Sequence, residues 1–218
     1  MSRRKVSIIG LAATGPGSGK DTLFDQLKAD GFEVVNIKFA DHLTKQTAAC
    51  FKGSFDHGVH PTDFIWLRND PKAKDIPFHM FAIKRLTHMG YQRFLLDQGH
   101  DPSEPRSARW HLIEYGTSYR RKYLQQDSYW LDEGMQAARW AVTNGKIAII
   151  TDVRFPNEAQ AVQAEGELVF VDAPWVDPAK GGVADGLIKP SDCDHIITNI
   201  WGNPETLKEQ FNDIYQLA

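Results

Sequence analysis

Apolar residues along the chain follow two kinds of spacing, and together these predict strands that alternate with helices. The mainly apolar segment at residues 6–11 and the continuous apolar run at residues 147–151 are typical of buried strands. Each run is followed by apolar positions three and four residues apart, which predict a helix with one buried face. The predicted strands are residues 6–11, 32–39, 147–151, 167–172 and 196–198. The predicted helices are residues 22–28, 41–51, 105–116, 128–144, 156–165 and 204–217.

This alternation predicts an α/β fold with a mostly parallel sheet and helices on both of its faces. The pattern breaks between residues 52 and 105, where five prolines separate short apolar clusters. We expect an insertion there. Within it, apolar residues at helical spacing predict one helix at residues 78–89.

The composition is that of an ordinary globular protein. Of the 218 residues, 42% are hydrophobic and 24% are charged, which argues against a disordered or fibrous chain. The net charge of -3 argues against binding along a nucleic-acid backbone, since that needs a broad basic surface. The two cysteines, Cys50 and Cys193, offer no disulfide framework and fit a reducing cytoplasm. No run reaches the ~20 apolar residues of a membrane span, so we expect no membrane partner.

The first predicted strand leads through a glycine-rich loop into a lysine and a helix. This order matches the phosphate-binding pattern GxxxxGK[ST], except that Thr14 replaces the first glycine and Asp21 follows the lysine. Backbone N–H groups of such a loop and the positive end of the helix attract phosphate, and the lysine adds a mobile charge. A structural or dinucleotide-binding turn is the alternative. The predicted phosphate-binding residues are Gly15, Gly17, Ser18, Gly19, Lys20, Asp21 and Thr22.

Two carboxylates stand at positions that suit a magnesium ion. Asp152 ends the apolar strand at residues 147–151, on the side of an open α/β sheet where ligands sit. Asp21 either caps the predicted helix or holds Mg²⁺ through water, and the hydroxyl of Thr22 is next to it. We therefore expect Mg²⁺ at Asp21, Thr22 and Asp152, directly or through water. Arg154 either binds phosphate or forms an ion pair with Asp152 in the turn.

Several arginines lie in or near the predicted helix at residues 105–116. Arg106 lies near its start, where a positive charge is unfavourable unless an anion binds. Arg120 and Arg121 follow in a polar segment and form either a solvated face or an anion clamp. Phosphoryl transfer needs positioning and positive charge more than a general base. The lysine, the arginines and the two acids match that need.

Several segments resemble the bacteriophage-type deoxynucleoside monophosphate kinases, a branch of the P-loop nucleoside monophosphate kinase superfamily. The most specific are the loop sequence SGKDT and the sequence DVRFPNE, and the resemblance covers most of the chain. Shorter matches are the pairs Pro105-Arg106 and Gly116-Thr117, followed by Arg120 and Arg121. The longer segments are SGKDT at 18–22, FADHLTK at 39–45, DSYW at 127–130, DVRFPNE at 152–158 and DHIITN at 194–199.

The resemblance implies a single kinase domain over residues 1–218, with the three-layer α/β/α fold of P-loop NTPases. An inserted acceptor-binding and lid region would span approximately residues 52–130, and the lid would close to exclude water. With ATP and Mg²⁺, such an enzyme transfers the γ-phosphate to a deoxynucleoside monophosphate. The implied catalytic residues are Lys20, Arg120, Arg121 and Arg154. The implied acceptor-binding residues are Phe39, Lys45, Arg106, Thr117, Arg120, Trp130 and Arg154, and the implied adenine-pocket residue is Asn199.

The chain departs from this family at Thr14, in the insertion, and at residues 111–115, which read HLIEY where the family commonly has a glutamine. The accepted base is therefore open. One alternative is a kinase of a modified deoxynucleotide or of a hydroxymethylated base in phage DNA. Others are a P-loop ATPase switch and a structural protein with a relic loop. The expected partners are nucleotides in the cytoplasm, that of the host if the chain is phage-encoded, and a homodimer is compatible with the sequence.

Overall fold

The computed structural model describes residues 6–51, 60–70, 72–177 and 186–216, and its chain divides into two compact units. The sheet unit consists of Met1–Phe39 and Leu131–Ala218, and the helical unit is the continuous segment Ala40–Trp130. The acceptor-binding and lid region expected at approximately residues 52–130 ends at the same residue as the helical unit, beyond the irregular segment 52–105. The helical unit begins earlier than the predicted boundary at residue 52, which itself lies outside the described residues.

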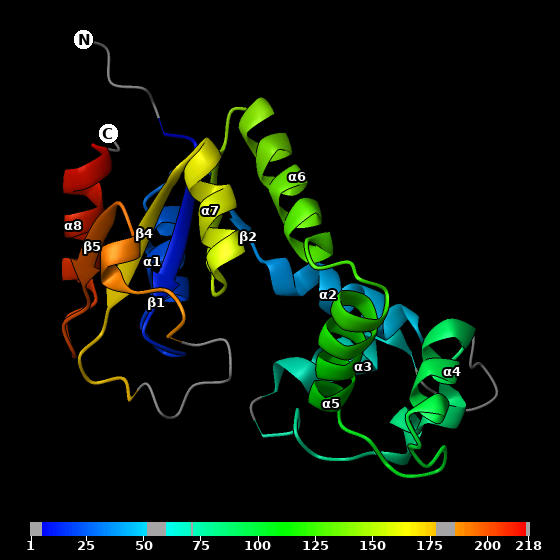
Figure 1. The fold of residues 1–218 in the computed structure, drawn as a ribbon. Coiled ribbons are helices and arrows are strands. Elements are labelled where there is room, and N and C mark those ends of the chain that lie inside the picture. The colour runs from blue at the N-terminus through cyan, green and yellow to red at the C-terminus, as the bar shows by residue number, and fades with distance from the viewer. Residues whose placement is uncertain (1–5, 52–59, 71, 178–185, 217–218) are drawn as a thin grey trace. The chain divides into compact units, whose positions relative to one another are not determined.

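The sheet unit is built on five parallel strands in the order β2-β3-β1-β4-β5 (Figure 1). In register, Ile9 of β1 lies beside Ile149 of β3 on one side and Glu167 of β4 on the other. The predicted α/β fold with a parallel sheet is thus confirmed. The strands are β1 (Ile8–Ala13), β2 (Val34–Ile37), β3 (Ile147–Ile150), β4 (Glu167–Asp172) and β5 (His195–Thr198).

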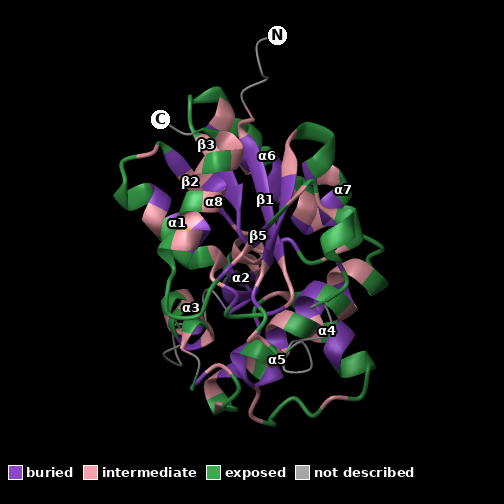
Figure 2. Cartoon of the chain, turned by 90° about the vertical axis from the view of Figure 1, so that its left-hand side faces the viewer, coloured by how far each residue is buried: buried purple, intermediate pink, exposed green. Residues whose placement is uncertain are grey.

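Two pairs of helices cover the two faces of this sheet, which gives three layers. On one face, Leu23 and Leu27 of α1 and Phe211 of α8 pack against Ile9 and Leu11. On the other face, residues of α6 and α7 pack against the alternate side chains of the same strands. Figure 2 shows the strands as buried and the helices as exposed on their outer sides. The four helices are α1 (Lys20–Ala29), α6 (Tyr129–Thr143), α7 (Pro156–Glu165) and α8 (Glu205–Tyr215).

The strand order fixes where a ligand would bind. The connection from β1 to β2 contains α1 on one face, whereas the connection from β3 to β4 contains α7 on the other face. Because β1 and β3 are neighbours, their connections leave the sheet in opposite directions at its carboxyl edge. Open α/β sheets bind ligands at such a switch point.

The helical unit has its own core, which is rich in aromatic side chains. Phe51, Phe64, Phe81 and Tyr91 are fully buried and contact one another or the neighbouring rings. No described helix is both long enough and apolar enough to cross a membrane. The helices are α2 (Phe39–Ala49), α3 (Pro61–Asn69), η2 (His79–Phe81), η3 (Ile83–Arg85), α4 (Met89–Asp97), α5 (Ala108–Ile113) and η4 (Glu114–Tyr123).

The predicted helix at residues 78–89 is wrong. Phe78 pairs with Arg106 through two backbone hydrogen bonds, and the two short 3₁₀ helices that follow are separated by an extended residue, Ala82. Phe81, Ala82 and Leu86 reach the core from this irregular backbone, and their spacing resembles that of a helix without being one. The regular helix α4 starts only at Met89, where the side chain of His88 accepts a hydrogen bond from the N–H of Tyr91.

The predicted helix at residues 105–116 is α-helical only from Ala108 to Ile113. Ser107 caps its start by accepting a hydrogen bond from the N–H of Trp110. The chain then continues as a π-helix, η4, through Tyr123. Tyr115 and Tyr119, four residues apart on this helix, are both buried, although the sequence of the segment is mostly polar.

Candidate functional site

The glycine-rich loop, residues 14–19, connects β1 to α1 with two residues in the left-handed region. Gly17 has φ of 85° and Gly19, the N-cap of α1, has φ of 97°. Ser18 is buried, and its hydroxyl donates a hydrogen bond of 2.7 Å to the carbonyl of Gly15. The loop therefore turns tightly into the N-terminus of the helix. Lys20 and Thr22, both predicted site residues, lie in the first turn of α1, with Lys20 half-buried and Thr22 exposed.

Asn199, which follows the edge strand β5, binds the backbone of this loop. Its side-chain amide donates a hydrogen bond of 3.0 Å to the carbonyl of Ser18, and it occupies the space that a Cβ on Gly19 would need. Asn199 is buried and directly follows β5. The amide thus holds the backbone of the loop, and the predicted role of Asn199 in an adenine pocket stays a prediction.

Asp21 is held by side chains from two neighbouring strands. Its Oδ1 lies 2.7 Å from Nζ of Lys38, which directly follows β2. The hydroxyl oxygen of Thr151, after β3, lies 3.4 Å from the same Oδ1 and 3.0 Å from Oδ1 of Asn36. Since a hydroxyl has one proton, Thr151 donates to one of these two acceptors at a time. The ion pair with Lys38 is therefore the main contact of this oxygen.

The second predicted acid, Asp152, is fixed at the end of β3. Its Oδ1 accepts a hydrogen bond of 2.9 Å from the backbone N–H of Phe39. The ring of Phe39 is 3% exposed and packs on Gly134 of α6, so this side chain belongs to the core of the sheet unit. The predicted role of Phe39 in binding an acceptor stays a prediction.

The turn after Asp152 is shaped by a buried carboxylate. Oε2 of Glu158 accepts hydrogen bonds from the backbone N–H groups of Arg154 and Phe155, at 2.9 and 3.1 Å. These bonds cap the start of α7 and leave the side chain of Arg154 exposed. The DVRFPNE segment is thus a structured strand-to-helix turn at the carboxyl edge of the sheet.

Oxygen ligands suited to Mg²⁺ are present in this part of the sheet unit. Magnesium prefers one or two carboxylates together with hydroxyl, water and phosphate oxygens. Asp21 and Thr22 lie in the first turn of α1, and Asp152 lies at the end of β3, the strand beside β1. These three residues would hold the ion, which would supply charge to neutralise phosphate oxygens.

In the helical unit, Arg120 is held entirely by uncharged groups. Its guanidinium donates to the hydroxyl of Tyr115 at 2.9 Å, to Oε1 of Gln46 at 3.2 Å and to Oε1 of Gln126 at 2.9 Å. The same group lies 4.7 Å from the ring centre of Tyr129 and 5.3 Å from that of Tyr115. Burial, the largest cause, raises the pKa of Tyr115 to about 12, against the opposing effect of Arg120. Within the described residues, no carboxylate pairs with Arg120.

The remaining predicted residues of the helical unit have varied surroundings. Arg106 pairs with Glu104 and lies 4.4 Å from the ring centre of Trp110, and its buried Nε has no hydrogen-bond partner among the described residues. Trp130 is 2% exposed and packs on Tyr129. Its indole N–H likewise lacks a partner within the described part of the chain. Lys45 and Thr117 are exposed, and Arg121 is half-buried.

Two tryptophans that the sequence did not single out lie beside the glycine-rich loop. Trp175 and Trp201 follow β4 and β5, and their ring centres are 5.5 Å apart at an angle of 70°. The side chain of Val176 lies next to the position that a Cβ on Gly15 would take. Trp201, 78% exposed, is two residues beyond Asn199. Their positions shortly after predicted strands were the available signal. Lys38 and Thr151 were also missed, because both lie inside the predicted strands at residues 32–39 and 147–151, whereas β2 and β3 end one residue before them.

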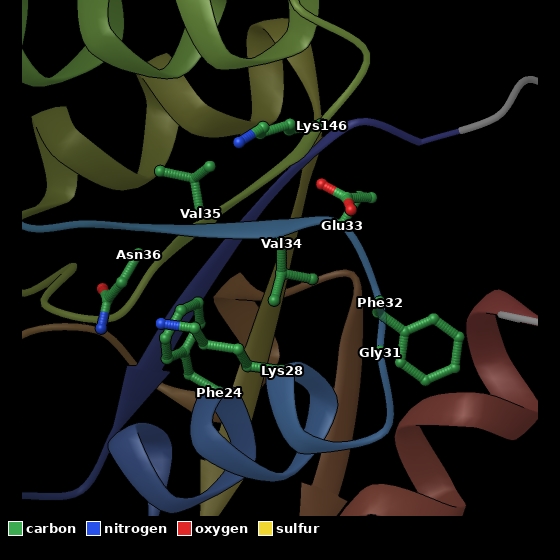
Figure 3. Close-up of a pocket in the computed structure, with 9 residues that line it drawn as sticks. All are labelled: Phe24, Lys28, Gly31, Phe32, Glu33, Val34, Val35, Asn36 and Lys146. Atoms are coloured by element: carbon green, nitrogen blue, oxygen red, sulfur yellow. The ribbon is translucent and has the colours of Figure 1, made fainter.

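A groove of about 530 Å³ runs along the edge strand β2 (Figure 3). Phe24 and Lys28 of α1 lie on one side of the strand in this view, and Val35 and Lys146 on the other. Of the residues that line it, Asn36 belongs also to the network around Asp21. The groove is shallow and follows the sheet edge, so it adds no chemistry to the candidate site.

Comparison with known proteins adds little to this description. No protein-family model matches the chain, and no curated protein matches it. Among solved structures, it is similar to the crystal structure of TT1252 from Thermus thermophilus, at 12% identity and a TM-score of 0.42. That similarity covers 99% of this chain and 100% of the other.

Proposed function

We propose that this chain is a nucleoside monophosphate kinase, which transfers the γ-phosphate of ATP to a deoxynucleoside monophosphate and yields ADP and a deoxynucleoside diphosphate. The observation that carries the proposal is the glycine-rich loop. Two left-handed glycines, Gly17 and Gly19, turn its backbone into the N-terminus of α1, directly before Lys20. Such a terminus attracts phosphate through its N–H groups and its dipole.

The strand order supports phosphate chemistry over a dinucleotide-binding turn. In the dinucleotide-binding order 3-2-1-4-5-6, the first strand lies beside the second. Here β3 lies between them, so that Asp152 ends the strand next to the glycine-rich loop. A carboxylate at this position suits a magnesium ion bound to the phosphates of ATP. Lys20 and Arg154 would then neutralise charge on the transferring phosphate.

The helical unit would supply the acceptor site. Arg120 has no carboxylate partner within the described residues, so its charge is available to an anion without breaking an ion pair. A guanidinium fork binds two oxygens of a phosphate at once. The acceptor oxygen of a monophosphate is already ionised, which makes a general base unnecessary. Arg106 and Arg121 are further candidates for the same phosphate.

The choice of a deoxynucleotide rests on the resemblance of the loop and the DVRFPNE segment to phage deoxynucleoside monophosphate kinases. Trp201, which is exposed, and Trp175, which is partly buried, offer aromatic faces near the loop on which the base of ATP would stack. We further propose that the enzyme works in the cytoplasm, that of the host for a phage gene. A homodimer is compatible with this function but is not required by it.

The experiment that tests the function is an ADP-release assay with ATP, Mg²⁺ and a panel of deoxynucleoside and ribonucleoside monophosphates. We expect release that depends on one or a few deoxynucleotides. Lys20→Ala should lower it by ~10³ or more, because a preorganised charge is lost from the transfer site. Equal release without any acceptor would identify an ATPase switch instead. Transfer of labelled phosphate to duplex DNA alone would identify a DNA kinase.

A further inference from the structure

Asp21 poses an electrostatic problem for a phosphate site. It lies in the first turn of α1, directly after Lys20 and the glycine-rich loop. A helix N-terminus carries about half a positive charge, and a carboxylate there helps the helix but repels an incoming phosphate. By itself, Asp21 would cancel the charge of Lys20.

Lys38 lies where it can solve this problem. Its Nζ is 2.7 Å from Oδ1 of Asp21, and its side chain is 31% exposed against 67% for that of the aspartate. Lys38 follows β2, the edge strand, and reaches past the end of β3 toward α1. The contact therefore joins the end of β2 to the first turn of α1, at the carboxyl edge of the sheet where the glycine-rich loop also lies.

The surroundings hold this pair in place. Thr151 is 3% exposed, and its hydroxyl oxygen lies within 3.4 Å of Asp21 and 3.0 Å of Asn36. Asn36 and Lys38 project from the same strand end, two residues apart. A fully exposed lysine would lose little by leaving its partner, but Lys38 is only 31% exposed, and the buried hydroxyl of Thr151 lies within 3.4 Å of the same oxygen of Asp21.

We propose that Lys38 is a positioning residue of the phosphate site, which neutralises Asp21 so that the first turn of α1 keeps a net attraction for the phosphates of a nucleotide. The inference rests on the proposed function only in taking the glycine-rich loop to bind phosphate. It explains how an aspartate is tolerated next to Lys20. It also leaves the second oxygen of Asp21 for the magnesium ion that this residue would help to hold.

The test measures ATP binding by calorimetry in EDTA, so that the charge of Asp21 is separated from any metal contact. Four variants form the set: Lys38→Ala, Lys38→Arg, Asp21→Asn and the double variant Lys38→Ala/Asp21→Asn. The matched control is Lys208→Ala, because Lys208 pairs with Asp30 at the opposite end of the same helix. Each protein is also checked by thermal unfolding.

We expect Lys38→Ala to weaken ATP binding by about 10-fold or more at low salt, since an uncompensated carboxylate would face the phosphates. The double variant should recover to within about 3-fold of the wild type, because the charge that needed neutralising is gone. Lys38→Arg should bind almost normally, and Lys208→Ala should bind like the wild type. The loss in Lys38→Ala should shrink at high salt.

Two results would overturn the inference. If Lys38→Ala binds ATP as well as the wild type, the pair is a surface contact without a role in the site. If the double variant is as weak as Lys38→Ala, Lys38 acts on the phosphates directly and not through Asp21. Phosphate transfer is assayed in parallel: a wild type that binds ATP but phosphorylates no monophosphate would refute the proposed kinase while the binding results on Lys38 still stand.

Discussion

At the scale of single residues, the backbone conformation of Gly19 decides whether the glycine-rich loop can form. Its φ of 97° is unfavourable for any side chain, and a Cβ there would collide with the amide of Asn199. We expect Gly19→Ala to weaken ATP binding by about 10-fold or more, because the N–H groups around it would be displaced. The control is Gly31→Ala, which has φ of 87° but no described atom within 4 Å of its Cβ position. Titration of ATP into both variants makes the comparison, and equal binding by the two would contradict the expectation.

Also at the residue scale, His111 makes the stability of the protein depend on pH. It is fully buried, its Nε2 donates to the carbonyl of Phe81 at 2.7 Å, and its Nδ1 accepts from the hydroxyl of Tyr91 at 3.2 Å. Burial, the largest cause, lowers the pKa of His111 from 6.5 to about 4. The unfolded chain therefore binds a proton at a higher pH than the folded protein does. Its contribution to stability is complete above pH 6.5 and is lost as the pH falls toward 4.

Between pH 7 and pH 4, this linkage should remove about 3 kcal/mol from the free energy of unfolding. Denaturant unfolding of the wild type and of His111→Asn at both pH values measures the effect. The variant is less stable at pH 7, but its pH dependence should be weaker by that amount. His79→Asn, at an exposed position of the same unit, serves as the control and should keep the wild-type dependence. Equal pH dependence of the wild type and His111→Asn would contradict the argument.

At the scale of elements, the π-helix η4 brings Arg120 into contact with the aromatic rings of the helical unit. Its guanidinium has only uncharged partners among the described residues, and a lysine could not reproduce the fork that reaches Tyr115, Gln46 and Gln126 together. We expect Arg120→Lys to raise the KM for the monophosphate by about 10-fold or more while the KM for ATP changes less than about 2-fold. Steady-state kinetics with each substrate varied in turn measures both. The control is Arg109→Lys. Arg109 lies on α5 and forms an exposed ion pair with Asp75, so this change should leave both KM values unchanged.

The elements also show why one part of the fold could be predicted from the sequence and another could not. Continuous apolar runs marked β3 and β4 almost to the residue, and α7 was predicted with its observed bounds, because each buries a regular face. The core of the helical unit is filled largely by aromatic rings carried on 3₁₀ turns and a π-helix, so its apolar spacing followed no regular period. Similarly, Asp152 was predicted from its place after a buried strand. Lys38 was missed because its partner, Asp21, is distant in sequence.

At the scale of the whole molecule, each unit has a hydrophobic core of its own. The aromatic core of the helical unit is drawn from Ala48 to Trp130 and the two cores of the sheet unit from the remaining segments. A core of its own is the main requirement for independent folding, and the continuous segment Ala40–Trp130 is within the size range of small domains. The residues of the proposed reaction are likewise distributed over both units: the proposed ATP site lies in the sheet unit, and Arg120 lies in the helical unit.

We therefore expect the segment Ala40–Trp130, expressed alone, to fold with helical circular dichroism and to unfold cooperatively, because its core residues come from within the segment. It should not bind ATP, since the glycine-rich loop belongs to the sheet unit. Phe64→Ala serves as the control: removal of this fully buried ring should abolish cooperative unfolding of the isolated segment, as loss of such a ring costs about 3–5 kcal/mol. A segment without cooperative unfolding would mean that its core is stable only within the whole chain. The helical unit would then be a lobe of one kinase domain, as the resemblance to deoxynucleoside monophosphate kinases implies, and not a domain in its own right.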